Sequence, residues 1–128
     1  MPIQAITILP ENAVTIIRGT SKTLELVVTD ADGKVVDLTG AKVVMSVKEF
    51  LTDTNPLVQK ISDVPVQAQI TLPREGKARI YLVPADTQTL AAKQYVFDVW
   101  VILSGGKRFA VVLPSTFIVQ AGVTILPL

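Results

Sequence analysis

Apolar residues recur at every second position through most of this chain, and glycine, proline and aspartate separate the alternating runs. A period of two is that of a β-strand with one face on a core, whereas a helix repeats about every 3.6 residues. The clearest runs cover residues 22–29, 41–50, 77–83 and 95–103. The sequence therefore predicts an all-β domain of about seven to nine short strands, with turns about every ten residues.

The order of these runs predicts an antiparallel β-sandwich of immunoglobulin-like type, formed by residues 1–128 as a single domain. No regular alternation of strands and helices argues for a parallel sheet. Only residues 84–92 have helical character, as one short turn with Pro84 at its start and Leu90 facing the core. The Cys-Trp-Cys pattern of antibody domains is missing, so the likeness is one of architecture.

Turn residues predict how neighbouring strands connect. Asp32-Gly33 and Thr39-Gly40 lie in a loop between the strands at 22–29 and 41–50, and we expect the second strand to fold back on the first. Hairpins are expected between 66–72 and 77–83, with Val66, Ala68, Ile70 and Leu72 at alternate positions, and between 95–103 and 107–116, with Phe109, Val111 and Leu113 on one face. Pro56 and Pro114 suggest an edge strand at 57–61 and a bulge in the last strand.

The composition excludes most catalytic chemistry. The chain has neither histidine nor cysteine, which removes the commonest general base, the commonest transition-metal ligand and the disulfide. Its formal net charge is +1, and no cluster of Lys and Arg suggests a nucleic-acid face. We expect no enzyme, no cofactor, no metal and no nucleic-acid partner.

Hydropathy suggests a surface that other chains cover. No basic leader and no run of about 18 apolar residues occur, so we expect neither secretion by a signal peptide nor a membrane span. Yet 49% of the residues are hydrophobic, only 18% are charged, and the mean hydropathy is +0.49. That apolar content is high for a domain that covers itself with charge.

Two apolar arms, residues 1–10 and 122–128, end the chain. The segment Ile6–Pro10 is echoed by Val123–Pro127, and both are β-prone. Such segments add to sheet edges of their own domain or of a neighbour, so we expect a homo-oligomer. The predicted interface residues are Ile3, Ile6, Ile8, Leu9, Val123, Ile125 and Leu126.

Several polar or aromatic residues have both a functional and a structural interpretation. Asp30, Asp32 and Asp37 could ligate Ca²⁺, but turns use the same residue types, and no EF-hand spacing is present. Trp100 and Tyr95 could stack on a sugar, or belong to the core or an interface; Trp100 is kept as a possible surface contact.

Two further aspartates are interpreted as structural. Asp98 lies in an apolar strand, which predicts an ion pair with a Lys or Arg. Asp86-Thr87 is expected to cap the helical turn.

Three motifs in order carry a family resemblance: Asp32–Ala41 (DGKVVDLTGA), Pro84–Thr87 (PADT) and Tyr95–Val99 (YVFDV). Over roughly residues 14–124 the chain resembles the Ig-like domain at the start of upper baseplate proteins, and in small tail or neck proteins, of tailed bacteriophages. The long receptor-binding or trimerising region that follows it in baseplate proteins is missing.

This resemblance implies a structural component of the virion, assembled in the host cytoplasm, whose partners are other virion proteins. No membrane partner is implied. A capsid decoration protein and a carbohydrate- or host-surface-binding module are the alternatives.

Overall fold

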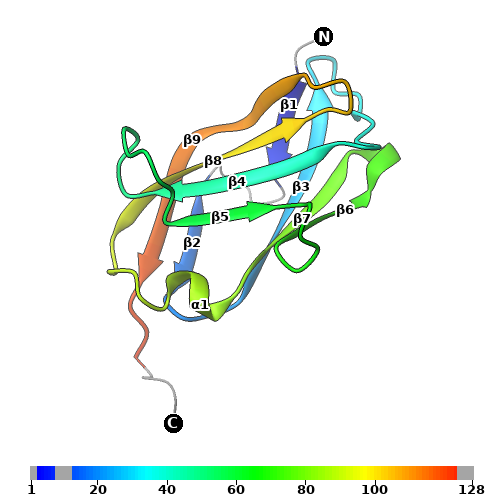
Figure 1. Cartoon of the computed structure of the whole chain (residues 1–128). Helices are drawn as coiled ribbons and strands as arrows, with labels where there is room; N and C mark the ends of the chain where they lie inside the picture. Colours follow the sequence, from blue (N-terminus) through cyan, green and yellow to red (C-terminus); the bar gives the residue numbers. More distant parts are fainter. Residues whose placement is uncertain (1–2, 8–12, 124–128) are drawn as a thin grey trace.

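The computed structural model describes residues 3–7 and 13–123, and of residues 3–7 only the backbone. These residues form two β-sheets packed face to face (Figure 1). One sheet has four strands in the order β1-β3-β7-β6, and the other has five in the order β2-β9-β8-β4-β5. The strands are β1 (Ile3–Thr7), β2 (Val14–Ile17), β3 (Lys22–Asp30), β4 (Lys42–Lys48), β5 (Val58–Ile61), β6 (Ala68–Leu72), β7 (Lys77–Leu82), β8 (Gln94–Ile102) and β9 (Arg108–Gln120).

The topology is that of an immunoglobulin-like sandwich, as predicted. All strand pairs among the described residues are antiparallel except β2 with β9, which runs parallel from Val14 beside Phe117 to Ile17 beside Gln120. Two short helical turns interrupt the strands, η1 (Pro73–Glu75) and α1 (Pro84–Thr87). The expected helical turn is therefore confirmed, and β5 lies at a sheet edge as expected.

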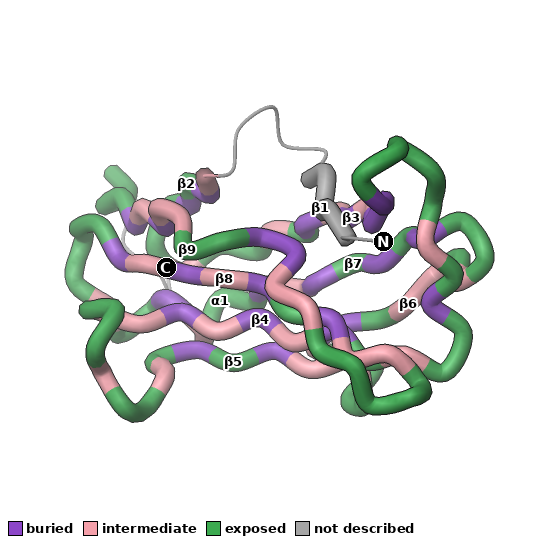
Figure 2. The backbone as a smooth tube through the Cα atoms, turned by 90° about the horizontal axis from the view of Figure 1, so that it is seen from above, coloured by how far each residue is buried: buried purple, intermediate pink, exposed green. Residues whose placement is uncertain are grey.

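The period-two pattern places one side of each strand in the core. Along β4, β5 and β8 buried residues alternate with more exposed ones (Figure 2). Phe97 of β8 meets Phe117 of β9 edge to face, with ring centroids 6.1 Å apart. In the alternating runs of β3, β4, β7 and β8, one set of alternate positions is buried: Leu24, Leu26, Val28, Val43, Met45, Val47, Ala78, Ile80, Leu82, Tyr95, Phe97, Val99 and Val101.

The connection between β3 and β4 differs from the prediction. Strand β4 does not fold back on β3 but pairs with β5 and β8 in the opposite sheet. The loop crosses between the sheets because its own Leu38 is fully buried in the core. Its backbone is fixed there by the Leu38 N–H, which donates to the carbonyl of Pro73 over 2.8 Å.

Strand β9 carries the bulge predicted near Pro114. The register against β8 shifts twice, between Phe97 and Val99 and between Val99 and Trp100. The expected alternation is therefore wrong here: Val111 and Val112 are both buried, while Leu113 is exposed. Val66 is also exposed, because β6 begins only at Ala68.

Gly76 fixes the β6–β7 connection against the crossing loop. Its φ is +67°, and its carbonyl accepts a hydrogen bond from the Val28 N–H over 2.8 Å. A Cβ at this position would lie 2.6 Å from the Val28 carbonyl oxygen and 3.0 Å from that of Val36. Both obstacles are backbone atoms, so no side-chain rotation relieves the contact.

We expect Gly76→Ala to destabilise the fold much more than Gly33→Ala. Both glycines have positive φ, but nothing lies within 4 Å of a Cβ at Gly33. Gly33→Ala should therefore cost only the left-handed backbone penalty, about 1–2 kcal/mol. Gly76→Ala should add an overpacking cost of about 1–3 kcal/mol, measured by urea unfolding. Equal costs for the two variants would contradict this account of the close approach.

Candidate functional site

The α1 turn contains the most buried ion pair of the described residues. Lys60 Nζ of β5 lies 2.7 Å from Asp86 Oδ2, and both side chains are largely buried. The same carboxylate accepts the Val83 N–H over 2.7 Å, at the start of the turn. Asp86 therefore caps the turn, as predicted, and also ties it to the five-stranded sheet. No sequence signal indicated that Lys60 would be buried.

Thr87 and Tyr95 complete this corner of the sandwich. The buried hydroxyl of Thr87 accepts the Gly19 N–H over 2.9 Å, which joins the turn to the β2–β3 connection. The Tyr95 hydroxyl donates to the carbonyl of Ala91 over 2.7 Å. A tyrosine at this point of an Ig-like domain, bonded to the backbone just upstream, forms a tyrosine corner. The sequence held a signal for it, a Tyr at the start of the alternating run at 95–103.

Asp30 and Asp37 stabilise turns in the loop between β3 and β4 that crosses from one sheet to the other. Asp30 Oδ1 accepts the backbone N–H groups of Asp32 and Lys34, and Asp37 Oδ1 accepts the hydroxyl and N–H of Thr39. These bonds, the Thr39 hydroxyl first, lower the pKa of the Asp37 carboxyl. Among residues 13–123 no group of three or more acidic side chains is placed to hold a metal ion.

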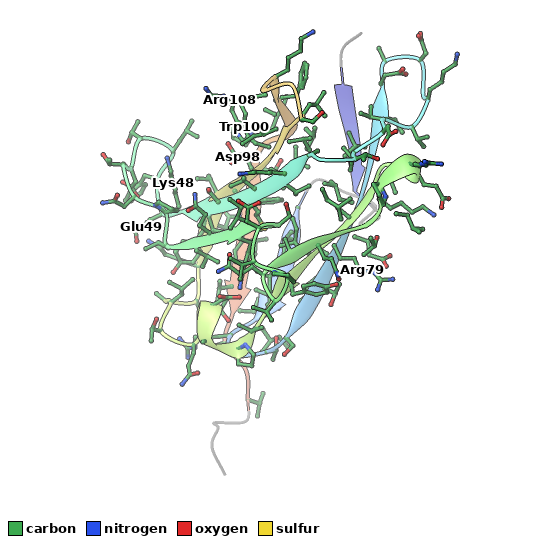
Figure 3. All side chains as sticks on the ribbon, turned by 45° about the vertical axis from the view of Figure 1, so that its right-hand side comes forward. Lys48, Glu49, Arg79, Asp98, Trp100 and Arg108 are labelled. Carbon is green, nitrogen blue, oxygen red and sulfur yellow. The ribbon has the colours of Figure 1, made fainter. Side chains whose placement is uncertain are left out.

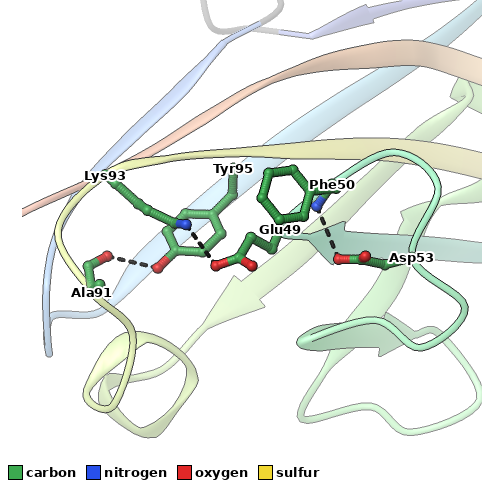
Figure 4. Close-up of polar contacts among 6 residues, drawn as sticks. All are labelled: Glu49, Phe50, Asp53, Ala91, Lys93 and Tyr95. Carbon is green, nitrogen blue, oxygen red and sulfur yellow. Dashed lines mark hydrogen bonds and ion pairs between the residues drawn. The ribbon is translucent and has the colours of Figure 1, made fainter.

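A polar cluster lies beside Tyr95 at the start of β8 (Figure 4). Lys93 Nζ lies 2.6 Å from Glu49 Oε2 and 5.5 Å from the ring centroids of Phe50 and Tyr95. Its hydrogen bond to Glu49 raises the pKa of Lys93. The Phe50 N–H donates to Asp53 Oδ2 over 3.0 Å. The cluster fixes the start of the β4–β5 loop and presents no reactive group.

Trp100 lies on the outer face of the five-stranded sheet and is 41% exposed. Its indole N–H donates to Asp98 Oδ2 over 3.0 Å, so both side chains are held on the same face of β8. Within the described part of the chain, Asp98 does not form the predicted ion pair; the Trp100 indole takes the place of the cation. Beside them is a shallow groove of about 220 Å³, with Ser46, Lys48, Leu51, Val96 and Pro114 along its walls.

The predicted arm residues are only partly described. Ile3 and Ile6 belong to β1, whose backbone pairs with β3 of the same chain. Val123 is fully exposed. Ile8, Leu9, Ile125 and Leu126 lie outside the described residues. In the part of the chain that is described, no helix is long and apolar enough to cross a membrane.

Comparisons with known proteins show a similarity in fold. No protein-family model and no curated protein matches the chain. The crystal structure of CopC from Methylosinus trichosporium OB3b has a TM-score of 0.51 at 14% identity and covers 96% of this chain and 100% of that one. The GspB Siglec domain has a TM-score of 0.54 at 15% identity, over 98% of this chain and 60% of that one. The chain thus shares an Ig-like β-sandwich with them.

Tyr95→Phe should destabilise the protein by about 1 kcal/mol, because one buried hydrogen bond is lost and the ring remains. Urea unfolding followed by Trp100 fluorescence measures the change. Tyr81→Phe is the matched control, since its hydroxyl bonds to Gln69 at the surface. If the two variants lose equal stability, the Ala91 bond has no special role.

Thr39→Val should raise the pKa of Asp37 towards its ordinary value of 3.8, because the hydroxyl is the first cause of the lowering. A lowered carboxyl pKa stabilises the fold above the unfolded-state pKa, and this stabilisation is lost as pH falls through the folded-state pKa. An NMR titration of the Asp37 side chain measures the shift. Thr39→Ser, which keeps the hydroxyl, should leave the pKa low.

Proposed function

We propose that the protein is a structural component of a tailed-bacteriophage virion, in the baseplate, tail or neck, and that it acts by protein–protein assembly. The family resemblance of its three motifs suggests this role. Each motif has a structural task in this chain. The crossing loop buries Leu38, the Pro84–Thr87 turn provides Asp86 and Thr87 for the corner, and β8 carries Tyr95. Such a rigid scaffold suits a part that is built into a particle.

The observation that carries the proposal is the apolar surface of the described residues. Large hydrophobic side chains are exposed at many positions, among them Phe50 at 60%, Leu51 at 63% and Leu113 at 68%. Scattered single examples are normal, but here they accompany apolar residues that are neighbours in register on the outer face of the five-stranded sheet, among them Val44 and Trp100. Exposed apolar area of this kind favours a partner that removes it from water. Assembly, rather than catalysis, is the activity that this surface supports.

Strand addition at a sheet edge supplies a mechanism. The two sheets have four edge strands among the described residues, β1, β6, β2 and β5. On two of them a side chain already occupies a backbone group: Lys22 Nζ donates to the Thr15 carbonyl of β2, and the Ile61 N–H of β5 donates to Gln67 Oε1. The four-stranded sheet ends on one side at β1, the N-terminal arm itself, which has one partner strand among the described residues. We propose that this edge receives an apolar arm from a neighbouring copy, with main-chain hydrogen bonds giving affinity.

Removing residues 122–128 should leave a folded protein that no longer self-associates. Strand β9 ends at Gln120, whose carbonyl still accepts the Arg18 N–H, so the deletion spares the paired strand. Light scattering over a dilution series measures the mass of the full-length and shortened chains. Circular dichroism confirms that both are folded.

The double substitution Ile125→Asp with Leu126→Asp is the matched test, because it keeps the length and removes only the apolar character. Val66→Asp is its control, since that side chain is exposed and lies outside both arms. Unchanged self-association after both the deletion and the double substitution would show that the arm is not the joint. A full-length monomer at every concentration would remove the homo-oligomer from the proposal.

A further inference from the structure

The two outer faces of the sandwich differ in chemistry. On the four-stranded sheet, Arg79 pairs with Glu25 at 3.1 Å, and Tyr81 bonds to Gln69. These side chains satisfy one another and make a polar, solvated surface. On the five-stranded sheet, apolar side chains also lie among the outward positions, at Val44, Val96, Trp100, Ile102 and Ala110. The apolar surface is therefore concentrated on one face.

A continuous apolar row crosses the five-stranded sheet at Trp100. Its neighbours in register are Val44 on β4 and Ala110 on β9, and Val44 is in turn paired with Ile61 on β5. Above and below this row lie Ile102 and Val96 on the same side of β8. Cross-strand neighbours on one face of a sheet touch, so Ile61, Val44, Trp100 and Ala110 form one row, while the pair of Ser46 with Asp98 lies between that row and Val96.

One cation without an ion pair among the described residues lies at each end of this surface, while Lys42, which is also in register with Ile102, is paired with Asp63. Lys48 pairs in register with Val96, and Arg108 pairs with Ile102. Neither cation forms an ion pair with a side chain of the described residues, whereas the neighbouring Glu49 is already engaged by Lys93. Six residues of β8 separate the two ends, which corresponds to about 20 Å. Figure 3 shows Arg108, Trp100, Asp98 and Lys48 following one another along one side, with Arg79 on the other.

We propose that the surface from Lys48 to Arg108, centred on Trp100, docks a different protein through an extended segment with an apolar centre and an acidic residue at each end. The apolar row would pack against the apolar centre of that segment, and Lys48 and Arg108 would pair with its carboxylates. Charge complementarity of this kind sets register and excludes wrong partners. The inference rests on the proposed assembly role for its choice of a protein as occupant.

A second copy of this face is a poor occupant. Asp98 is the only acidic residue among the outward positions of β4, β8 and β9 in the described chain, and it is bonded to Trp100. An isologous contact would therefore place Lys48 and Arg108 against cations, without a free carboxylate. Like charges brought together in this way cost binding energy. A partner of opposite charge removes the conflict.

The test is a selection of random dodecapeptides displayed on a library against the full-length protein. Enriched peptides should have an apolar centre and acidic residues about six positions apart, the spacing that matches about 20 Å of extended chain. They should change the fluorescence of Trp100, which is the only tryptophan of the chain. Lys48→Glu with Arg108→Glu should weaken their binding at least tenfold. A peptide with lysines in place of the acids should bind that double variant and not the unchanged protein.

The matched control is Lys77→Glu with Arg79→Glu, the same residue types on the opposite outer face, which should leave binding unchanged. No enrichment, peptides without the acidic pair, or equal binding to both double variants would overturn the proposal. So would quenching of Trp100 by methyl glycosides with no peptide binding, which would make the face a sugar site. A change in oligomeric mass on Lys48→Glu with Arg108→Glu would make a second copy the occupant. Failure of the arm truncations leaves this test unaffected, so the two proposals fail separately.

Discussion

The polar corner around α1 is the interaction on which the rest of the sandwich depends. Lys60 of the five-stranded sheet pairs with Asp86, the Gly19 N–H of the β2–β3 connection donates to Thr87, and the Tyr95 hydroxyl at the start of β8 donates to the Ala91 carbonyl. The three partners lie within a few residues of one another in and just after α1. Apolar packing alone holds two sheets together without fixing how they slide. A buried charge pair and a buried hydroxyl are costly to leave unmet, so they select one arrangement. The P-A-D-T motif, Pro84–Thr87, therefore helps to fix how the two sheets are arranged relative to each other.

Local pattern predicted the strands well, because period and turn chemistry are properties of neighbouring residues. Pairing across the sandwich was harder to predict. Strand β4 was expected on β3, but the burial of Leu38 decides that the loop crosses to the other sheet. The burial of Lys60 and the indole partner of Asp98 depend on strands distant in sequence. The period could show only that Trp100 and Tyr95 lie on opposite faces of β8, because both faces are largely apolar; the structure shows that Trp100 faces outward, and the register shows which residues surround it.

The two outer faces of the sandwich differ in how their charges are paired. The four-stranded face has its charges paired internally, while the five-stranded face keeps two cations beside its apolar row. Free charges at the rim oppose contact between copies of that face, and they would attract the acidic partner that we propose. In that proposal the same residues restrain aggregation and favour specific docking.

The parallel pairing of β2 with β9 has a mechanical consequence. Both strands run in the same direction, from Val14 beside Phe117 to Ile17 beside Gln120. Tension that enters at the start of β2 and leaves at the end of β9 pulls the two strands past each other along their length. The hydrogen bonds between them then bear the load together in shear, instead of breaking one after another. We expect a domain with this parallel pairing to bear tension between the start of β2 and the end of β9 while its core remains packed.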